Sequence, residues 1–215
     1  MKIFIILLTL LIPTVSCAES TINCHCFQDR SFNHQNTTAA DPYFLATTQN
    51  SLLANLYNID KRNIVKTKMG GEDGTYLWIL FDVAMRSGLS VDQIKKKYSS
   101  NKTWTKTITQ IAFLSPAPEK LYFHLASSPE NLADYIINLQ LIKHFGVTAT
   151  EINQWRKIGM TRKELILAIF LGGNPATNYN RVTSDAISWG KLLFEQGLLD
   201  GDSINKELKR RLTQS

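Results

Sequence analysis

The residues best suited to chemistry lie close together near the N-terminus, in the sequence Cys24-His25-Cys26. A further imidazole follows at His34. Thiolates and imidazoles are the ligands that zinc and copper ions prefer, so these four residues predict a Zn(II) or Cu(I) site. Because neighbouring side chains of an extended segment point in opposite directions, Cys24 and Cys26 can share an ion, whereas His25 joins them only if the backbone turns.

The same two cysteines have other states open to them. A disulfide between Cys24 and Cys26 spans one residue, which lies at the short end of the geometric range and strains the bond. A disulfide between two chains and a pair of free, redox-cycling thiols complete the alternatives. The segment is therefore expected to handle a metal ion or redox chemistry, or to form a structural disulfide.

The first 18 residues indicate the compartment in which these thiols would work. A basic start at Lys2 precedes an apolar run over residues 3–12, and small residues follow at 16–18. This pattern is typical of a secretory signal peptide, here cleaved after Ala18. We therefore expect the mature chain to be extracytoplasmic, either periplasmic or secreted, where disulfides persist.

Cys17 gives the same segment a second interpretation. Thr14-Val15-Ser16-Cys17 resembles a bacterial lipoprotein signal, in which Cys17 would carry a lipid anchor to a bacterial membrane. That signal usually has leucine three places before the cysteine, where this chain has Thr14. The apolar run is shorter than the ~20 residues that span a bilayer, and no later segment approaches that length. No transmembrane helix is expected in the mature chain.

Composition indicates a folded, mildly basic protein. The chain is 44% hydrophobic and 10% aromatic, which is typical of a globular protein rather than a disordered one. Its formal net charge of +6 becomes +5 once Lys2 is removed, because residues 1–18 contain no acidic side chain. This surplus is compatible with an anionic membrane face or polyanionic wall polymers, although simple solubility explains it as well. Export excludes nucleic-acid partners, even though residues 148–171 could pass for a basic helix-turn-helix.

From Asp41 onward the sequence predicts an all-α fold, a bundle of about eight to ten helices. Capping boxes, in which Ser or Thr is followed three residues later by Gln or Glu, begin at Ser90, Thr148 and Thr161. Gly88 suits the left-handed end of a helix. No strand-rich region occurs. The clearest predicted helices cover residues 41–57, 60–70, 75–87, 128–146, 162–171, 176–183, 189–196 and 203–212.

Two prolines within three residues mark a linker between two helical halves. The two halves can be aligned with an offset of 85 residues at Trp104 and Trp189. Each of these tryptophans is followed two residues later by a lysine. This alignment predicts an internal duplication, with chance similarity of amphipathic helices as the alternative. The expected signal peptide, N-terminal arm, first half, linker and second half are residues 1–18, 19–40, 41–114, 115–127 and 128–215.

Two stretches resemble a family of uncharacterised exported bacterial proteins. The first is the Cys-His-Cys-Phe sequence within residues 24–32, and the second, within residues 40–68, contains Asp-Pro-Tyr-x-Leu-Ala-Thr-Thr-Gln-Asn at Asp41–Asn50. The resemblance covers about a third of the chain. It implies export and a bacterial source, and it implies no activity, cofactor or partner.

The chain carries no motif of a known catalytic site. The nucleophile elbow Gly-x-Ser-x-Gly, the zinc motif His-Glu-x-x-His, a phosphate-binding glycine loop and a dinucleotide fingerprint are all absent from the sequence. His144 is expected in the last turn of its helix, where a cation is favourable. We therefore expect a non-catalytic binding or accessory protein whose partner is a protein or envelope component. The alternative is a metal- or redox-handling protein that uses Cys24, His25 and Cys26.

Overall fold

The computed structural model describes residues 27–214, so the predicted signal peptide and the Cys24-His25-Cys26 segment lie outside the described residues. Within residues 27–214 the chain forms twelve α-helices and no strand, which confirms the all-α prediction, with more helices than expected. None of the helices in these residues has both the length and the apolar character needed to cross a bilayer. The helices are α1 (Asp41–Leu56), α2 (Lys61–Met69), α3 (Gly74–Ser87), α4 (Val91–Asn101), α5 (Trp104–Thr109), α6 (Lys120–Leu125), α7 (Pro129–Phe145), α8 (Ala149–Lys157), α9 (Arg162–Leu171), α10 (Pro175–Thr183), α11 (Trp189–Glu195) and α12 (Gly201–Gln214).

Local sequence signals set most helix ends. The three predicted capping boxes are confirmed at Ser90, Thr148 and Thr161, where each hydroxyl accepts a backbone N–H and the Gln or Glu side chain bonds back to the capping residue. Gly88 ends α3 in the left-handed conformation, with φ of 70°. Helix α9 begins and ends at the predicted residues. Helix ends are therefore determined here by residues close in sequence.

Helix α12 is longer than predicted because its N-terminal cap lies further upstream. The Asp200 carboxylate accepts hydrogen bonds from the backbone N–H of Asp202 at 3.1 Å and of Ser203 at 2.7 Å. These bonds satisfy the free N–H groups of the first turn, so the helix starts at Gly201 rather than at Ser203.

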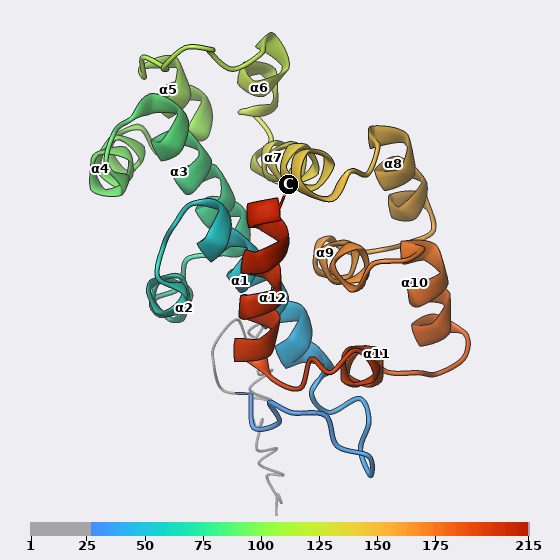
Figure 1. The fold of residues 1–215 in the computed structure, drawn as a ribbon. Helices are drawn as coiled ribbons and strands as arrows, with labels where there is room; N and C mark the ends of the chain where they lie inside the picture. The colour runs from blue at the N-terminus through green and yellow to red at the C-terminus, as the bar shows by residue number, and fades with distance from the viewer. Residues whose placement is uncertain (1–26, 215) are drawn as a thin grey trace, which may run out of the picture.

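Helix α1 lies in the middle of the molecule. It packs against α2, α9, α11 and α12, and Figure 1 shows α12 lying across it, with α3 to α6 on one side and α8 to α11 on the other. Because α1 is covered on several faces, even its polar residues Thr47, Thr48 and Asn50 are buried. The sequence predicted a helix over residues 41–57, but an amphipathic pattern does not predict its burial on several faces.

Helices from both predicted halves share one hydrophobic core. Helix α1 from the first half packs against α9 and α12 from the second, and α3 packs against α7. The order of helices is also parallel: a long helix with proline in its first turn is followed by a nine-residue helix, both in α1–α2 and in α7–α8. Trp104 and Trp189 each begin a later helix. The duplication itself stays a prediction.

The predicted linker, residues 115–127, contains α6, which is held to the core by a buried carboxylate. Tyr122 is 1% exposed, and its hydroxyl donates to Asp82 Oδ2 at 2.9 Å. Tyr57 and Arg86 also donate to Asp82, at 3.2 and 2.7 Å. Burial raises the pKa of the Asp82 carboxyl, and the Arg86 guanidinium opposes that rise. Both oxygens of the Asp82 carboxylate therefore accept hydrogen bonds, and these bonds join the end of α1 to α3 and α6.

Candidate functional site

Of the predicted metal ligands, the structure describes His34 alone. Its imidazole is exposed and lies edge-on to the rings of Phe32 and Phe194, with ring centroids 4.8 and 5.0 Å away. Aromatic contacts therefore place this part of the N-terminal arm against α11. Residues 27–214 contain no group of three or more His, Cys, Asp or Glu side chains that could hold a metal ion. The site formed by Cys24, His25, Cys26 and His34 stays a prediction.

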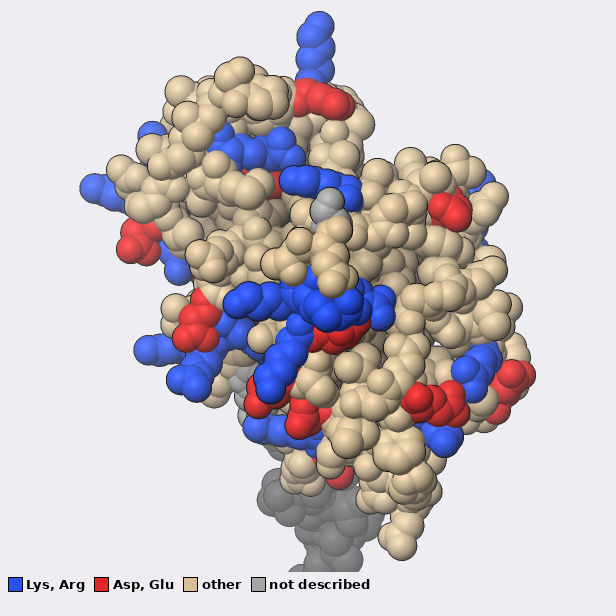
Figure 2. Space-filling model, in the orientation of Figure 1, with Lys and Arg blue, Asp and Glu red and all other residues tan. Residues whose placement is uncertain are grey.

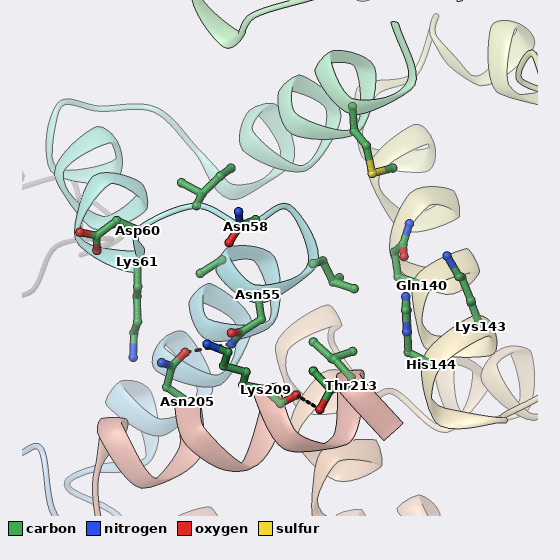
Figure 3. Close-up of a pocket in the computed structure, with 15 residues that line it drawn as sticks. Asn55, Asn58, Asp60, Lys61, Gln140, Lys143, His144, Asn205, Lys209 and Thr213 are labelled. Atoms are coloured by element: carbon green, nitrogen blue, oxygen red, sulfur yellow. Dashed lines mark hydrogen bonds between the residues drawn. The ribbon is translucent and has the colours of Figure 1, made fainter. Parts of the chain in front are cut away.

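A hollow that we call the basic cleft has a volume of about 640 Å³ and lies between the end of α1, α7 and α12. Figure 3 shows its polar side chains entering from these three sides. A volume of this size suits a small-molecule ligand. The polar lining residues are Asn55, Asn58, Asp60, Lys61, Gln140, Lys143, His144, Asn205, Lys209 and Thr213, and the apolar ones are Ala54, Leu56, Ile59, Met85 and Leu212.

The ends and faces of three helices position these side chains. Lys61 is the first residue of α2, directly after its capping residue Asp60. Lys143 and His144 lie in the last turn of α7, where basic side chains stabilise the negative end of the helix dipole. On α12, Asn205 and Lys209 are one turn apart and therefore share a face. The cleft thus combines local helix-end preferences with the tertiary packing of α12 on α1.

The lysines of the cleft have no carboxylate partner within the described residues. Lys143 and Lys209 are exposed and form no ion pair there. Lys61 Nζ donates to neutral oxygens, Thr47 Oγ1 at 2.6 Å and Gly201 O at 3.4 Å. Burial lowers the pKa of the Lys61 ammonium, and the more distant Asp202 opposes this. Three ammonium groups therefore line one cleft, and none of them forms a direct ion pair within the described residues.

Asp60 is the one carboxylate among the lining residues, and it is already engaged. Its Oδ1 accepts a hydrogen bond from the backbone N–H of Arg62 at 2.8 Å, which caps α2. Figure 3 shows the carboxylate on the α2 side, away from the α7 residues. The charge balance of the lining is therefore positive.

His144 adds a group that titrates near neutral pH. Partial burial lowers its pKa from the ordinary value of 6.5, and the neighbouring Lys143 ammonium lowers it further. At neutral pH the imidazole is therefore mainly uncharged, and it gains a positive charge in acid. An anion placed beside His144 and Lys143 would favour the protonated form.

Neutral amides complete the floor of the cleft. Asn55 Nδ2 donates to Asn205 Oδ1 at 3.0 Å and to Ser51 O at 2.8 Å, which orients both amides. Figure 3 shows this pair on the α1 and α12 side of the hollow, across from Lys143 and His144 on α7. The side-chain N–H groups of Asn205 make no hydrogen bond within residues 27–214 and can donate to a ligand. The cleft therefore offers charge and oriented donors, which together suit a carboxylate, phosphate or sulfate group.

Sequence analysis did not predict this cleft. His144 was identified only as a favourable cation at a helix end, and Lys61, Lys143 and Lys209 were not singled out. These lysines come from α2, α7 and α12, which are distant in sequence, and no local spacing links them. The packing of α12 against α1 and α7 brings these lysines together, and this packing depends on the whole fold.

A second group of charged side chains, the charged network, joins α3, α7, α8 and α9. Arg162 donates from Nε to Asp134 Oδ1 at 2.8 Å, from Nη2 to Glu130 Oε2 at 2.9 Å and from Nη1 to Thr75 Oγ1 at 3.0 Å. Arg156 Nη2 donates to the same Asp134 oxygen at 3.0 Å. Both arginines belong to the segment that resembled a helix-turn-helix in sequence. In the fold each guanidinium is paired with a carboxylate.

Lys68, near the end of α2, lies close to this network and is 8% exposed. Its Nζ donates to Asn50 Oδ1 at 2.6 Å. Burial lowers the pKa of the Lys68 ammonium to about 8, and the nearby cations Lys163 and Arg162 add to this, while Asp73 opposes it. Lys68 is therefore a buried cation held mainly by an amide.

Comparisons with known proteins give no family for this chain. A scan against protein-family models, a search of curated proteins and a search of solved structures each found no match.

Proposed function

We propose that this protein is an exported, non-catalytic binding protein whose basic cleft takes up an anionic ligand. The observation that carries the proposal is the arrangement of Lys61, Lys143 and Lys209 around one hollow whose single carboxylate caps a helix. Like charges brought together without counterions destabilise a folded protein. A bound anion would remove that repulsion.

The lining also indicates the size and kind of ligand. About 640 Å³ accommodates a molecule larger than a single inorganic ion. The side-chain amide of Asn205 supplies directional donors beside the lysines. The apolar side chains of Leu56, Ile59 and Leu212 line the same space. A ligand with an anionic group and an apolar portion would use all of these features.

Isothermal titration calorimetry with inorganic pyrophosphate at low ionic strength tests the proposal. The variant Lys143→Gln with Lys209→Gln removes two exposed charges that make no ion pair in the described residues, so folding should be unaffected. We expect it to bind pyrophosphate at least about tenfold more weakly than the wild-type protein, since each charge-assisted hydrogen bond contributes about 1.5–3 kcal/mol.

The matched control is Lys106→Gln with Lys157→Gln, which removes two exposed lysines from α5 and α8. Its net charge equals that of the cleft variant, so a general electrostatic effect would weaken binding in both. Unchanged affinity in the control and loss in the cleft variant support the proposal. Equal affinity in all three proteins, or no binding of pyrophosphate by the wild type, contradicts it.

Metal or redox handling by Cys24, His25 and Cys26 is the second candidate, and it rests on their residue types alone. Intact-mass measurement of the mature protein tests it together with export. An internal disulfide lowers the mass by about two daltons relative to the reduced chain, and a bound ion raises it until a chelator is added. A mature mass that begins after Ala18 supports the signal peptide, and one that begins at a lipid-bearing Cys17 supports the anchor. Reduced thiols without an ion would count against this candidate.

A further inference from the structure

A second hollow adjoins the basic cleft. It has a volume of about 600 Å³ and shares Asp60, Lys61 and Asn205 with the cleft, so the two form one continuous surface across α2, the end of α1, α7 and α12. Figure 2 shows lysine and arginine side chains gathered over the middle of this face. The residues that line the second hollow are Asp60, Lys61, Arg62, Val65, Lys66, Met69, Asp202 and Asn205.

The charges of this surface are mostly of one sign. Five basic side chains line the two hollows, against the two carboxylates of Asp60 and Asp202. Arg62 and Lys66 are exposed and form no ion pair in the described residues. A positive surface of this kind attracts an extended anionic partner. Its area is larger than the contact area of one small anion.

Two exposed methionines lie on the same surface. Met69 lines the second hollow and is 60% exposed, and Met85 lines the basic cleft and is 50% exposed. Exposed flexible apolar side chains beside lysines are the combination with which proteins bind membrane interfaces, because the apolar groups enter the acyl boundary while the lysines reach the phosphates. No Phe, Tyr or Trp side chain lines either hollow, so the surface lacks the stacking platform that single-stranded nucleic acids use.

We infer that this face docks on an anionic phospholipid bilayer, with a lipid phosphate in the basic cleft and Met69 and Met85 in the interface. The inference rests on the proposed anion-binding function and names the source of the anion. Each basic residue near an anionic surface changes membrane partitioning by about fivefold, so several acting together give firm, salt-sensitive binding. The two methionines add the apolar contact that a free anion does not require.

Sedimentation with vesicles tests the inference. The mature protein is mixed with vesicles of equimolar phosphatidylglycerol and phosphatidylcholine, or of phosphatidylcholine alone. We expect sedimentation with the anionic vesicles only, reduced at least about tenfold in Lys143→Gln with Lys209→Gln. We expect Met69→Ser to reduce vesicle binding severalfold while leaving the calorimetric affinity for pyrophosphate unchanged, because Met69 lines the second hollow and not the basic cleft.

The control for Met69→Ser is Leu121→Ser, which changes an apolar side chain that is 46% exposed on another part of the molecule. This control should bind vesicles as the wild type does. If pyrophosphate binds and anionic vesicles do not, or if the methionine variant and its control lose equal binding, the membrane inference is overturned while the proposed function stands. If neither pyrophosphate nor vesicles bind, both are overturned.

Discussion

The basic cleft and the charged network use the same residue types with opposite results. In the network, Arg156 and Arg162 are paired with Asp134 and Glu130, so the fold itself supplies the counterions. In the cleft, three lysines line one hollow and the single lining carboxylate caps a helix instead. The difference indicates that the network stabilises the packing of α7, α8 and α9, whereas the lysines of the cleft can still pair with an anionic ligand.

The largest effect on stability is expected from the network. Arg162→Met leaves the Asp134 carboxylate with one cation fewer and removes a hydrogen bond to Thr75 Oγ1. Because Arg162 is mostly buried but Glu130 is 69% exposed, we expect a loss of about 2 kcal/mol in the free energy of unfolding rather than the larger cost of breaking a fully buried pair. Urea denaturation measures this loss. An Arg162→Met protein as stable as wild type would remove the structural role of the network.

Lys68 should make stability depend on pH above neutrality. Its pKa is about 8 in the folded state, compared with 10.5 when unperturbed, so the unfolded chain binds its proton more tightly. The contribution of Lys68 to stability is therefore fully present above about pH 10.5 and is lost as pH falls through 8.

The variant Lys68→Met isolates this effect from the tyrosines that titrate at higher pH. Burial raises the pKa of Tyr76 to about 12, and this acts on stability in the opposite direction above pH 10. We expect the free-energy difference between wild type and Lys68→Met to change by about 2 kcal/mol between pH 8 and pH 10 in favour of the wild type. Denaturant unfolding at a series of pH values measures it. A constant difference would show that Lys68 is not a strongly desolvated cation.

In the cleft a smaller effect is expected, and it should appear in ligand binding rather than in folding. Because burial and Lys143 hold the pKa of His144 below 6.5, bound pyrophosphate should raise that pKa. Affinity should consequently increase as pH falls through this range, and His144→Gln should remove the increase. NMR titration of the imidazole signals, with and without pyrophosphate, measures the shift. The signals of His124, on α6, serve as the control and should not respond.

The smallest effect on stability is expected from the cleft lysines, and it distinguishes the basic cleft from the charged network. Lys143→Gln with Lys209→Gln should change the free energy of unfolding by no more than about 0.5 kcal/mol, because both side chains are exposed and unpaired in the described structure. Urea denaturation beside Arg162→Met gives the comparison. A loss similar to that of Arg162→Met would mean that the cleft lysines stabilise the fold, as the arginines of the charged network do.

The sequence predicted the parts of the structure that depend on neighbouring residues. The capping boxes at Ser90, Thr148 and Thr161, and the extent of α9, follow from hydroxyls, carboxylates and glycines within one helical turn. It did not predict that α1 would be covered on several faces, with Thr48 and Asn50 buried, because burial of polar residues depends on which helices pack around them.

The same distinction explains why the candidate site was missed. The sequence directed attention to Cys24, His25, Cys26 and His34, whose chemistry is visible from their types and spacing. The basic cleft is assembled from side chains of distant helices, each of which has an ordinary role when considered alone. Only tertiary packing places their charges together.

Chemical-shift mapping of the backbone amides with inorganic pyrophosphate tests the central claim most directly, because it locates the bound anion. We expect the perturbed signals to concentrate at the end of α1 and start of α2, at Lys143 and His144, and along α12 from Asn205 to Thr213. We also expect these perturbations to fall sharply in Lys143→Gln with Lys209→Gln. Perturbations centred on Arg156 and Arg162, or none at all, would contradict the assignment of the basic cleft as the binding site.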